Sequence, residues 1–403
     1  MSQLEQHNPL SFKFQSQRLL PCMSALGALC AASAFVGFVS PSQAEVLLGD
    51  YGALTVGVEA SVEANSNIRL NREEESDVIG VVEPRVLYRF DQGALYVDAF
   101  VGMEFREYNR HSEYSSQNFK SGFHLEFPYG EADPNLRMTL DGGYNESTNP
   151  DAMVQEIVER ETYHLNFNAW YYFTERYYLR SGAQYHDQRA VTSGFADIRT
   201  FTVPVDFFYR YSEDLALGVG YRYRDTRVRG ASPSADSTDH AVYVGAEGRV
   251  APSVDAEVRV GAQRRTFDHS GFGRDTAFFA EALVTWAISD LTTLQLRAGD
   301  DFDTSSANEK VDRIYAEVEL RHLFTDRITG ILGAGYSESD FTLLNGDQYR
   351  SDEVWFVTVG VDYDLIEDRL SVMGRLYHAD QNSNFANADY KHSVAKVGLS
   401  FVY

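Results

Sequence analysis

The sequence predicts an all-β fold, a transmembrane antiparallel up-and-down β-barrel of about 18 strands, because three patterns coincide. Apolar and polar residues alternate with a period of two along most of the chain after residue 45. Short turns alternate with longer polar loops between these segments, and aromatic residues stand at both ends of the apolar register. Together the patterns describe strands that cross a bilayer and are joined at alternate ends.

The N-terminal segment differs from the rest of the chain and predicts a secretory signal peptide over residues 1–44. Lys13 and Arg18 precede an apolar run from Leu19 to Val39, and small residues lead to the expected cleavage point. This small-residue exit disfavours the alternative of a transmembrane anchor. Residues 45–403 are then the mature barrel. Both cysteines lie in the signal segment, so disulfides and thiol chemistry are not expected in the mature chain.

The strand segments are long enough to span a membrane. Examples of strict alternation are Leu95 to Arg106, Val254 to Gln263 and Ile314 to Arg321. A strand of roughly 11 residues, at ~3.3 Å per residue and tilted by about 40°, rises roughly 28 Å along the membrane normal. This rise covers the apolar band of about 25 Å that outer-membrane barrels present to lipid.

The breaks between strands come in two kinds. Asp91 to Gly93 and Thr325-Asp326 are tight turns, whereas Asn65 to Asp77, Ser147 to Val158 and Asp340 to Asp352 are longer and polar. Their alternation predicts that turns gather at one end of the barrel and loops at the other. An even number of strands places both termini in the periplasm. Because the longest of these loops has 13 residues, we do not expect a constriction loop that folds into the lumen.

Aromatic residues on the apolar register predict two girdles at the membrane interfaces. Beside the short turns stand Phe90, Tyr129, Phe173, Tyr177, Tyr209, Trp286, Phe324 and Tyr363. Toward the long loops stand Phe105, Tyr144, Tyr163, Tyr185, Tyr223, Tyr336 and Trp355. Tyr403 falls in the short-turn girdle, so the last strand is expected to end at the periplasmic interface.

A sheet surrounded by lipid must close, because hydrocarbon offers no hydrogen bonds to unpaired backbone groups. The strand near Leu54 is therefore expected to pair with the strand near Leu399. The alternative of a secreted β-sandwich or β-solenoid explains the alternation. It does not explain the strand length, the two kinds of connection or the two girdles.

The inward register carries arginines and carboxylates and supplies the candidate lumen-lining residues. These candidates are Arg85, Arg137, Arg180, Arg222, Arg259, Arg297, Arg321, Arg375, Asp98, Glu104, Glu126, Asp141, Glu257, Glu317 and Glu319. Arginine forks pair well with carboxylates on neighbouring strands. Two interpretations remain open: a lumen wall braced by ion pairs, or a permeation path whose charges select a polar solute.

Other functions are disfavoured by the sequence. The net charge of -24 disfavours a nucleic-acid partner, because it would repel the phosphate backbone. The histidines of the mature chain are scattered, and neither G-x-S-x-G nor H-E-x-x-H occurs. We therefore expect no enzyme, no catalytic residue, no metal and no cofactor.

The stretch "VEANSNIRLNREEESDVIGVVEPRVLYRF", Val62 to Phe90, resembles the putative β-barrel porin 2 family. The hairpins of the type "HLFTDRITG" and the terminal aromatic residue add to the resemblance, which covers nearly the whole mature chain. It implies an 18-stranded outer-membrane barrel associated with capsule or exopolysaccharide synthesis and export. It implies no catalytic residue.

The resulting hypothesis is a polar channel in the outer membrane of a Gram-negative cell that takes part in exopolysaccharide or capsule export. One alternative is a general diffusion porin for small polar solutes, and another is a structural or adhesive surface barrel. The expected partners are outer-membrane lipid and lipopolysaccharide, the barrel assembly machinery and periplasmic polysaccharide-export components.

Overall fold

The computed structural model describes residues 46–130, 135–231, 233–269, 273–343 and 348–403. The expected signal peptide, residues 1–44, lies outside the described residues. Within them, the only helices are the three-residue 3-10 turns η1 (Gly49–Tyr51) and η2 (Ser112–Tyr114), so no helix there could serve as a membrane span. Nearly all the remaining regular structure is β-strand.

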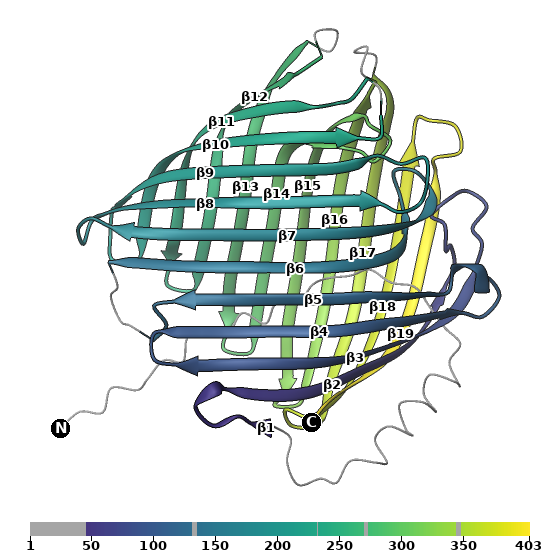
Figure 1. Cartoon of the computed structure of the whole chain (residues 1–403), viewed down its shortest axis with the longest axis horizontal. Coiled ribbons are helices and arrows are strands. Elements are labelled where there is room, and N and C mark those ends of the chain that lie inside the picture. The colour runs from purple at the N-terminus through teal and green to yellow at the C-terminus, as the bar shows by residue number, and fades with distance from the viewer. Residues whose placement is uncertain (1–45, 131–134, 232, 270–272, 344–347) are drawn as a thin grey trace.

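The strands form one antiparallel sheet (Figure 1). Its strands are β1 (Val46–Leu47), β2 (Ala53–Asn65), β3 (Asp77–Gln92), β4 (Leu95–Tyr108), β5 (Ser116–Phe127), β6 (Leu136–Asp151), β7 (Glu156–Tyr172), β8 (Tyr177–Ala190), β9 (Asp197–Arg210), β10 (Leu215–Arg229), β11 (Ser237–Ala251), β12 (Val254–Phe267), β13 (Arg274–Ser289), β14 (Thr292–Thr304), β15 (Lys310–Thr325), β16 (Ile328–Thr342), β17 (Gln348–Ile366), β18 (Leu370–Ser383) and β19 (Tyr390–Val402).

The sheet closes into a barrel of 18 strands, β2 to β19, which confirms the predicted fold class. Each strand pairs with the next along the chain, and β19 returns to pair with β2, where Val397 lies opposite Val62 and Leu399 opposite Ala60. The two-residue β1 adds only a short pairing to β2. Closure leaves no free sheet edge in the wall, as an apolar surrounding requires.

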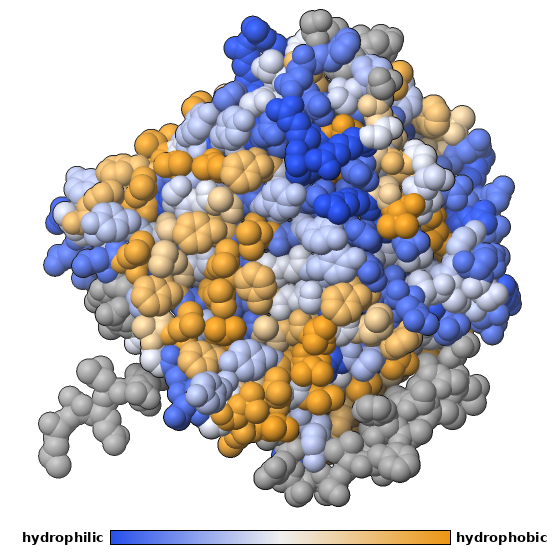
Figure 2. Space-filling model, viewed as in Figure 1, coloured by the Kyte–Doolittle hydropathy of each residue, from blue (hydrophilic) through white to orange (hydrophobic). Residues whose placement is uncertain are grey.

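The outer face of the barrel is apolar and uncovered. Val242, Val244, Leu376 and Val397 have between 56% and 60% of their surface exposed, although water would disfavour such exposure in a soluble protein. Hydrophobic residues cover much of the visible wall, and hydrophilic residues gather toward its ends (Figure 2). This arrangement is that of a barrel whose solvent is hydrocarbon.

None of the residues expected in the aromatic girdles is buried, but Tyr129 faces the interior. The ring of Tyr129 lies 5.0 Å from that of Tyr96, and both line the internal cavity described below. Tyr129 follows the end of β5 in a connection, where strand alternation no longer fixes the direction of a side chain.

The expected alternation of short turns and longer loops is present, with one main difference. The segment Ser147 to Val158 is a strand hairpin, because β6 continues to Asp151, opposite Glu156 of β7. The segment begins with five polar or turn-forming residues, Ser147 to Asp151, so it lacks the hydrophobic alternation that marks a strand in the bilayer. Its backbone hydrogen bonds nevertheless continue the ladder, since they do not depend on side-chain polarity.

Candidate channel lumen

A cavity of about 3170 Å³ runs through the barrel. At the short-turn end it is lined by residues such as Tyr129 and Thr174, and at the loop end by residues such as Asp151 and Ser306. Its walls come mainly from β2–β7 and from β14–β19, which face each other across the barrel (Figure 1). We call this part of the barrel the open half.

Most of the lumen-lining candidates lie in the wall of this cavity. They are Arg85, Arg137, Arg297, Arg321, Arg375, Asp98, Glu104, Glu126, Asp141, Glu317 and Glu319. The other candidates, Arg180, Arg222, Arg259 and Glu257, do not line it. These four lie in a part of the interior that side chains fill.

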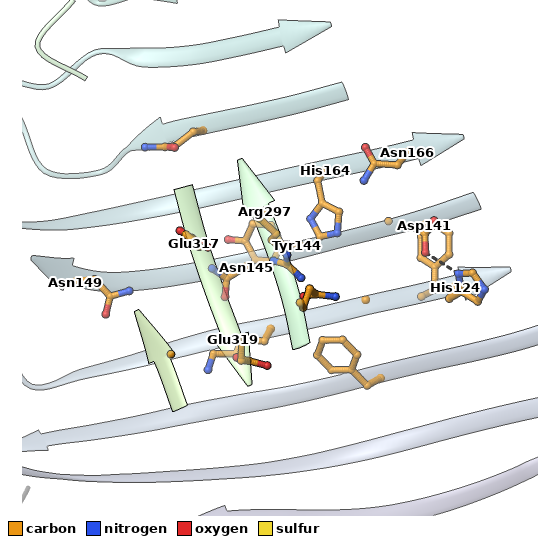
Figure 3. A pocket seen from close by; sticks show the side chains of 18 of the residues that line it. His124, Asp141, Tyr144, Asn145, Asn149, His164, Asn166, Arg297, Glu317 and Glu319 are labelled. Atoms are coloured by element: carbon orange, nitrogen blue, oxygen red, sulfur yellow. Dashed lines mark hydrogen bonds and ion pairs between the residues drawn. The ribbon is translucent and has the colours of Figure 1, made fainter. Parts of the chain in front are cut away.

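One wall of the open half carries amides, imidazoles and carboxylates on β5–β7. His124 Nδ1 lies 2.6 Å from Asp141 Oδ1, and both line the cavity, as do His164, Asn166 and Asn145 (Figure 3). The register places these residues on the inner face because successive side chains of a strand point to opposite sides. The wall therefore offers both hydrogen-bond donors and acceptors to a polar solute.

The opposite wall carries charges of both signs on β14 and β15. Arg321 donates from Nε to Glu319 Oε1 at 2.6 Å. Arg297 lies opposite Glu317 in the ladder (Figure 3), yet its exposed guanidinium has no hydrogen bond or ion pair with any described residue. An arginine without a fixed partner in a cavity wall has its guanidinium free to contact an anion.

Ion pairs brace the wall formed by β2–β5. Lys120 contacts both Glu83 and Glu104, and Arg85 donates to Glu59 at 2.9 Å. Each of these pairs joins different strands, so it strengthens the wall while it keeps charged groups at the cavity surface. In the open half, the charges that brace the wall therefore also line the cavity.

The interior between β8 and β14 is closed by a network of arginines and carboxylates, and we call this part the packed half. Asp301 of β14 accepts four hydrogen bonds of 2.8–3.0 Å from Arg222 and Arg224 of β10. Asp239 of β11 accepts from Arg224 at 2.6 Å and from Arg265 at 2.7 and 2.9 Å. The contacts of Asp301 bridge β10 and β14, which are not neighbours in the sheet, so the wall is sharply curved here.

A second part of this network surrounds Arg180 of β8. Its guanidinium contacts Asp206, Glu247 and Glu257 at 2.7–3.0 Å, on β9, β11 and β12. Arg259 pairs with Glu257 and with Glu281, the latter at 2.9 Å. The candidates Arg180, Arg222, Arg259 and Glu257 thus fill the barrel interior by pairing with one another and with nearby carboxylates.

Glycines on the inner register make this dense packing feasible. A Cβ at Gly220 would lie 2.2 Å from the Tyr243 ring, and a Cβ at Gly218 would lie 2.6 Å from the Phe208 ring. At Gly261 it would lie 2.0 Å from the backbone oxygen of Val242. Large side chains therefore lie flat against neighbouring strands, and the space left for solvent disappears.

The tip of the β6–β7 hairpin reaches across the loop-side mouth of the cavity. Arg350 of β17, on the opposite wall, donates to the carbonyl oxygens of Met153 at 2.6 Å and Ala152 at 3.3 Å. Arg160 contacts Asp151 within the hairpin and Ser306 beyond it. No long loop is expected to fold into the lumen; instead the tip of a strand hairpin lies across its mouth.

Loops cover the packed half at the same end. The Ala196 amide donates to the Ser306 carbonyl at 2.9 Å, and the Ala235 amide donates to Asn308 Oδ1 at 2.8 Å. Ala196 and Ala235 also pack in one apolar cluster with Val228 and Phe267. The sequence offered no signal for these contacts, because they join loops far apart in the chain.

Comparison with known proteins supports the fold and part of the resemblance. Residues 214–403 match the family model of putative beta-barrel porin 2, which confirms the resemblance over that part of the chain. The match does not include Val62 to Phe90, the stretch on which the sequence resemblance mainly depended. No curated protein sequence matches the chain significantly.

Several solved structures share the barrel architecture at low sequence identity. The Pseudomonas aeruginosa OpdK structure with vanillate is 12% identical, with 87% of this chain and 99% of that chain covered and a TM-score of 0.47. Pseudomonas aeruginosa OccK2 (OpdF) with glucuronate is 10% identical, with 87% and 98% covered and a TM-score of 0.49. A bacterial polysaccharide outer membrane secretin is 12% identical, with 86% and 98% covered and a TM-score of 0.38.

These structural similarities carry no argument about what the chain transports. The closed 18-stranded sheet, its apolar outer wall and the family match together identify a porin-like outer-membrane β-barrel.

Proposed function

We propose that this barrel is a diffusion channel for small polar solutes. The observation that supports this most directly is the cavity of about 3170 Å³, whose lining extends from the short-turn end to the loop end. Barrels of this strand number leave an aqueous channel unless side chains or inserted segments fill it. Here side chains fill only the packed half, and the open half keeps a polar path.

The lining favours solutes that carry hydroxyl or carboxylate groups. The unpaired Arg297 offers a cationic contact, and Asn145 and Asn166 offer amide donors and acceptors. Conduction requires several weak contacts rather than one tight site, because a tightly held solute would not leave. The lumen supplies such contacts along both walls.

Export of exopolysaccharide is the second candidate. It is supported by the family resemblance and by aromatic rings in the cavity wall, such as Tyr96, Phe100, Phe356 and Tyr377, on which sugar rings could stack. The hairpin tip held by Arg350 opposes this candidate, since a polymer would have to displace it.

Planar-bilayer recording tests the first candidate. The purified protein is expected to give stable single-channel conductance, and liposomes that contain it are expected to swell in small sugars or carboxylates. A protein that inserts but gives neither conductance nor swelling would contradict the diffusion channel. For the second candidate, a deletion strain should lose surface polymer while small-solute uptake is spared.

We further propose that the short turns and both termini face the periplasm and that the long loops face outward. The alternation of short and longer connections supports this orientation, since outer-membrane barrels have short periplasmic turns. An epitope inserted between Ser305 and Glu309 should be accessible on intact cells, whereas one at Asp326 should not. The reverse pattern would refute the orientation.

A further inference from the structure

The outward charges just beyond the apolar wall, on the loop side, are unevenly distributed around the barrel. On β4, β6, β7 and β16–β18 the outward residues at this level are acidic: Glu107, Glu146, Glu161, Glu338, Glu353 and Asp380. On β9–β13 they are mainly basic. We call this basic sector the cationic rim, formed by Arg199, Arg227, His240, Arg264 and Arg274.

The cationic rim is unusual for a chain with a net charge of -24. Hydrophilic residues gather over the loop-side part of β9–β11, next to the hydrophobic wall (Figure 2). Outside the rim, the outward cations Arg189 and Lys391 at this level are paired with Asp187 and Asp380, so the rim is a local positive patch. A patch of this kind attracts anions from its surroundings.

Most of the rim cations are not engaged by the protein itself. Arg227 pairs with Asp225 at 2.6 Å and also contacts Asp268. In contrast, Arg199, Arg264 and Arg274 have no hydrogen bond or ion pair with any residue that the structure describes. Their guanidinium groups are therefore available to an external partner.

The sheet register places two arginines directly opposite one another in the rim, Arg199 and Arg227. Arg264 lies opposite His240. Like charges in facing positions of a sheet destabilise it. An anion bound between the strands would offset this repulsion, and a phosphate group fits best because arginine forks bind its oxygens in pairs.

Exposed apolar side chains lie directly below the rim on the same strands. Val242 and Val244 of β11 are 59% and 56% exposed, and Phe278 of β13 is 57% exposed. A ligand that contacts both the arginines of the rim and the apolar side chains below them must carry phosphate next to acyl chains. A free phosphate would use the rim alone.

We propose that the cationic rim binds the phosphorylated headgroup of a glycolipid in the outer leaflet, with its acyl chains against β11–β13. This proposal rests on the membrane location of the barrel and is independent of what passes through the lumen. The guanidinium groups of Arg199, Arg264 and Arg274 hold the phosphates, and the apolar wall holds the chains.

The test compares two full-length proteins in detergent micelles by native mass spectrometry with bis-phosphorylated lipid A. One carries Arg199→Gln, Arg264→Gln and Arg274→Gln. The matched control carries Arg189→Gln and Lys391→Gln, which remove outward cations outside the rim that Asp187 and Asp380 already hold. The rim variant should bind lipid A about tenfold more weakly or worse, and the control should bind as the wild type does.

Further binding measurements identify the ligand and distinguish this proposal from the proposal of a diffusion channel. Lipid A without phosphates and inorganic phosphate should each bind much more weakly than the phosphorylated lipid. Equal binding of inorganic phosphate, or equal lipid binding by both variants, would overturn the lipid site.

The rim variant should keep wild-type conductance, since the lumen is unchanged. A wild-type protein that conducts but does not bind lipid A would overturn only the proposal of the lipid site. Failure of the wild type to enter bilayers would overturn both proposals.

Discussion

The packed half and the open half of the barrel contain the same kinds of inward residue, but these residues have different roles in the two halves. In the packed half, Arg265 and Asp239 each keep only 1% of their side-chain surface exposed. In the open half, Arg89 and Asp98 form a similar pair but remain 63% and 36% exposed. One pair closes the interior, and the other borders the cavity.

The difference shows that an inward charge is not by itself a pore-lining charge. Its role depends on whether the facing wall is close enough to complete its hydrogen bonds. Where the wall curves sharply and glycines let large side chains lie flat, the charges satisfy one another. Where the walls stand apart, water must solvate them.

Removal of a buried carboxylate in the packed half should have the largest effect on stability. Asp239→Ala leaves the guanidinium of Arg265 buried without its carboxylate partner, so the free energy of unfolding should fall by about 3–5 kcal/mol. The matched change in the open half is Asp98→Ala, which should cost only about 0–1 kcal/mol because its pair with Arg89 is solvated. Urea unfolding in detergent micelles measures both.

Equal losses of stability for Asp239→Ala and Asp98→Ala would contradict the division into two halves. Asp239→Asn keeps the shape of the side chain and removes its charge. A loss for Asp239→Asn close to that for Asp239→Ala would show that charge, rather than packing, holds the network together.

A single methyl group should also distinguish the two halves. Gly261→Ala would place a Cβ 2.0 Å from the backbone oxygen of Val242, so the strands of the packed half must shift. We expect a loss of about 1–3 kcal/mol. Gly374→Ala is the control, since a Cβ there meets nothing within 4 Å and should leave the unfolding midpoint nearly unchanged. Similar midpoints for the two variants would argue against tight packing.

A change of charge should alter permeation only in the open half. Arg297→Glu replaces an unpaired cation of the cavity wall, so the channel should become more selective for cations. Arg259→Gln removes a cation that pairs within the packed half and should leave selectivity as it is. Reversal potentials in a salt gradient measure the difference, and a shift for Arg259→Gln as large as that for Arg297→Glu would disprove the assignment.

Release of the hairpin tip should have the smallest effect. Arg350→Ala removes the two hydrogen bonds to the carbonyl oxygens of Ala152 and Met153. Single-channel conductance should rise modestly and become noisier, because the tip no longer stays across the mouth. Arg350→Lys keeps a donor and should restore part of the wild-type behaviour; unchanged traces for both variants would mean that the tip does not limit flow.

The local pattern of the sequence determined the strands, their inward and outward faces and the closure of the barrel. Side-chain direction alternates along every strand, and an apolar outer register requires closure, so neither depends on distant parts of the chain. For this reason Arg137, Arg297 and Glu317 could be assigned to the inner face from their positions alone. The same rule failed at Tyr129, which lies outside a strand.

Only the tertiary structure decided which inward residues border the cavity. Arg222 and Asp301 are 79 positions apart, and their contact exists because the closed sheet bends β10 toward β14. The contact of Arg350 with the β6–β7 tip likewise depends on two walls that meet across the lumen. Curvature and contact between distant strands arise from the whole closed sheet, so alternation along a single strand cannot predict them.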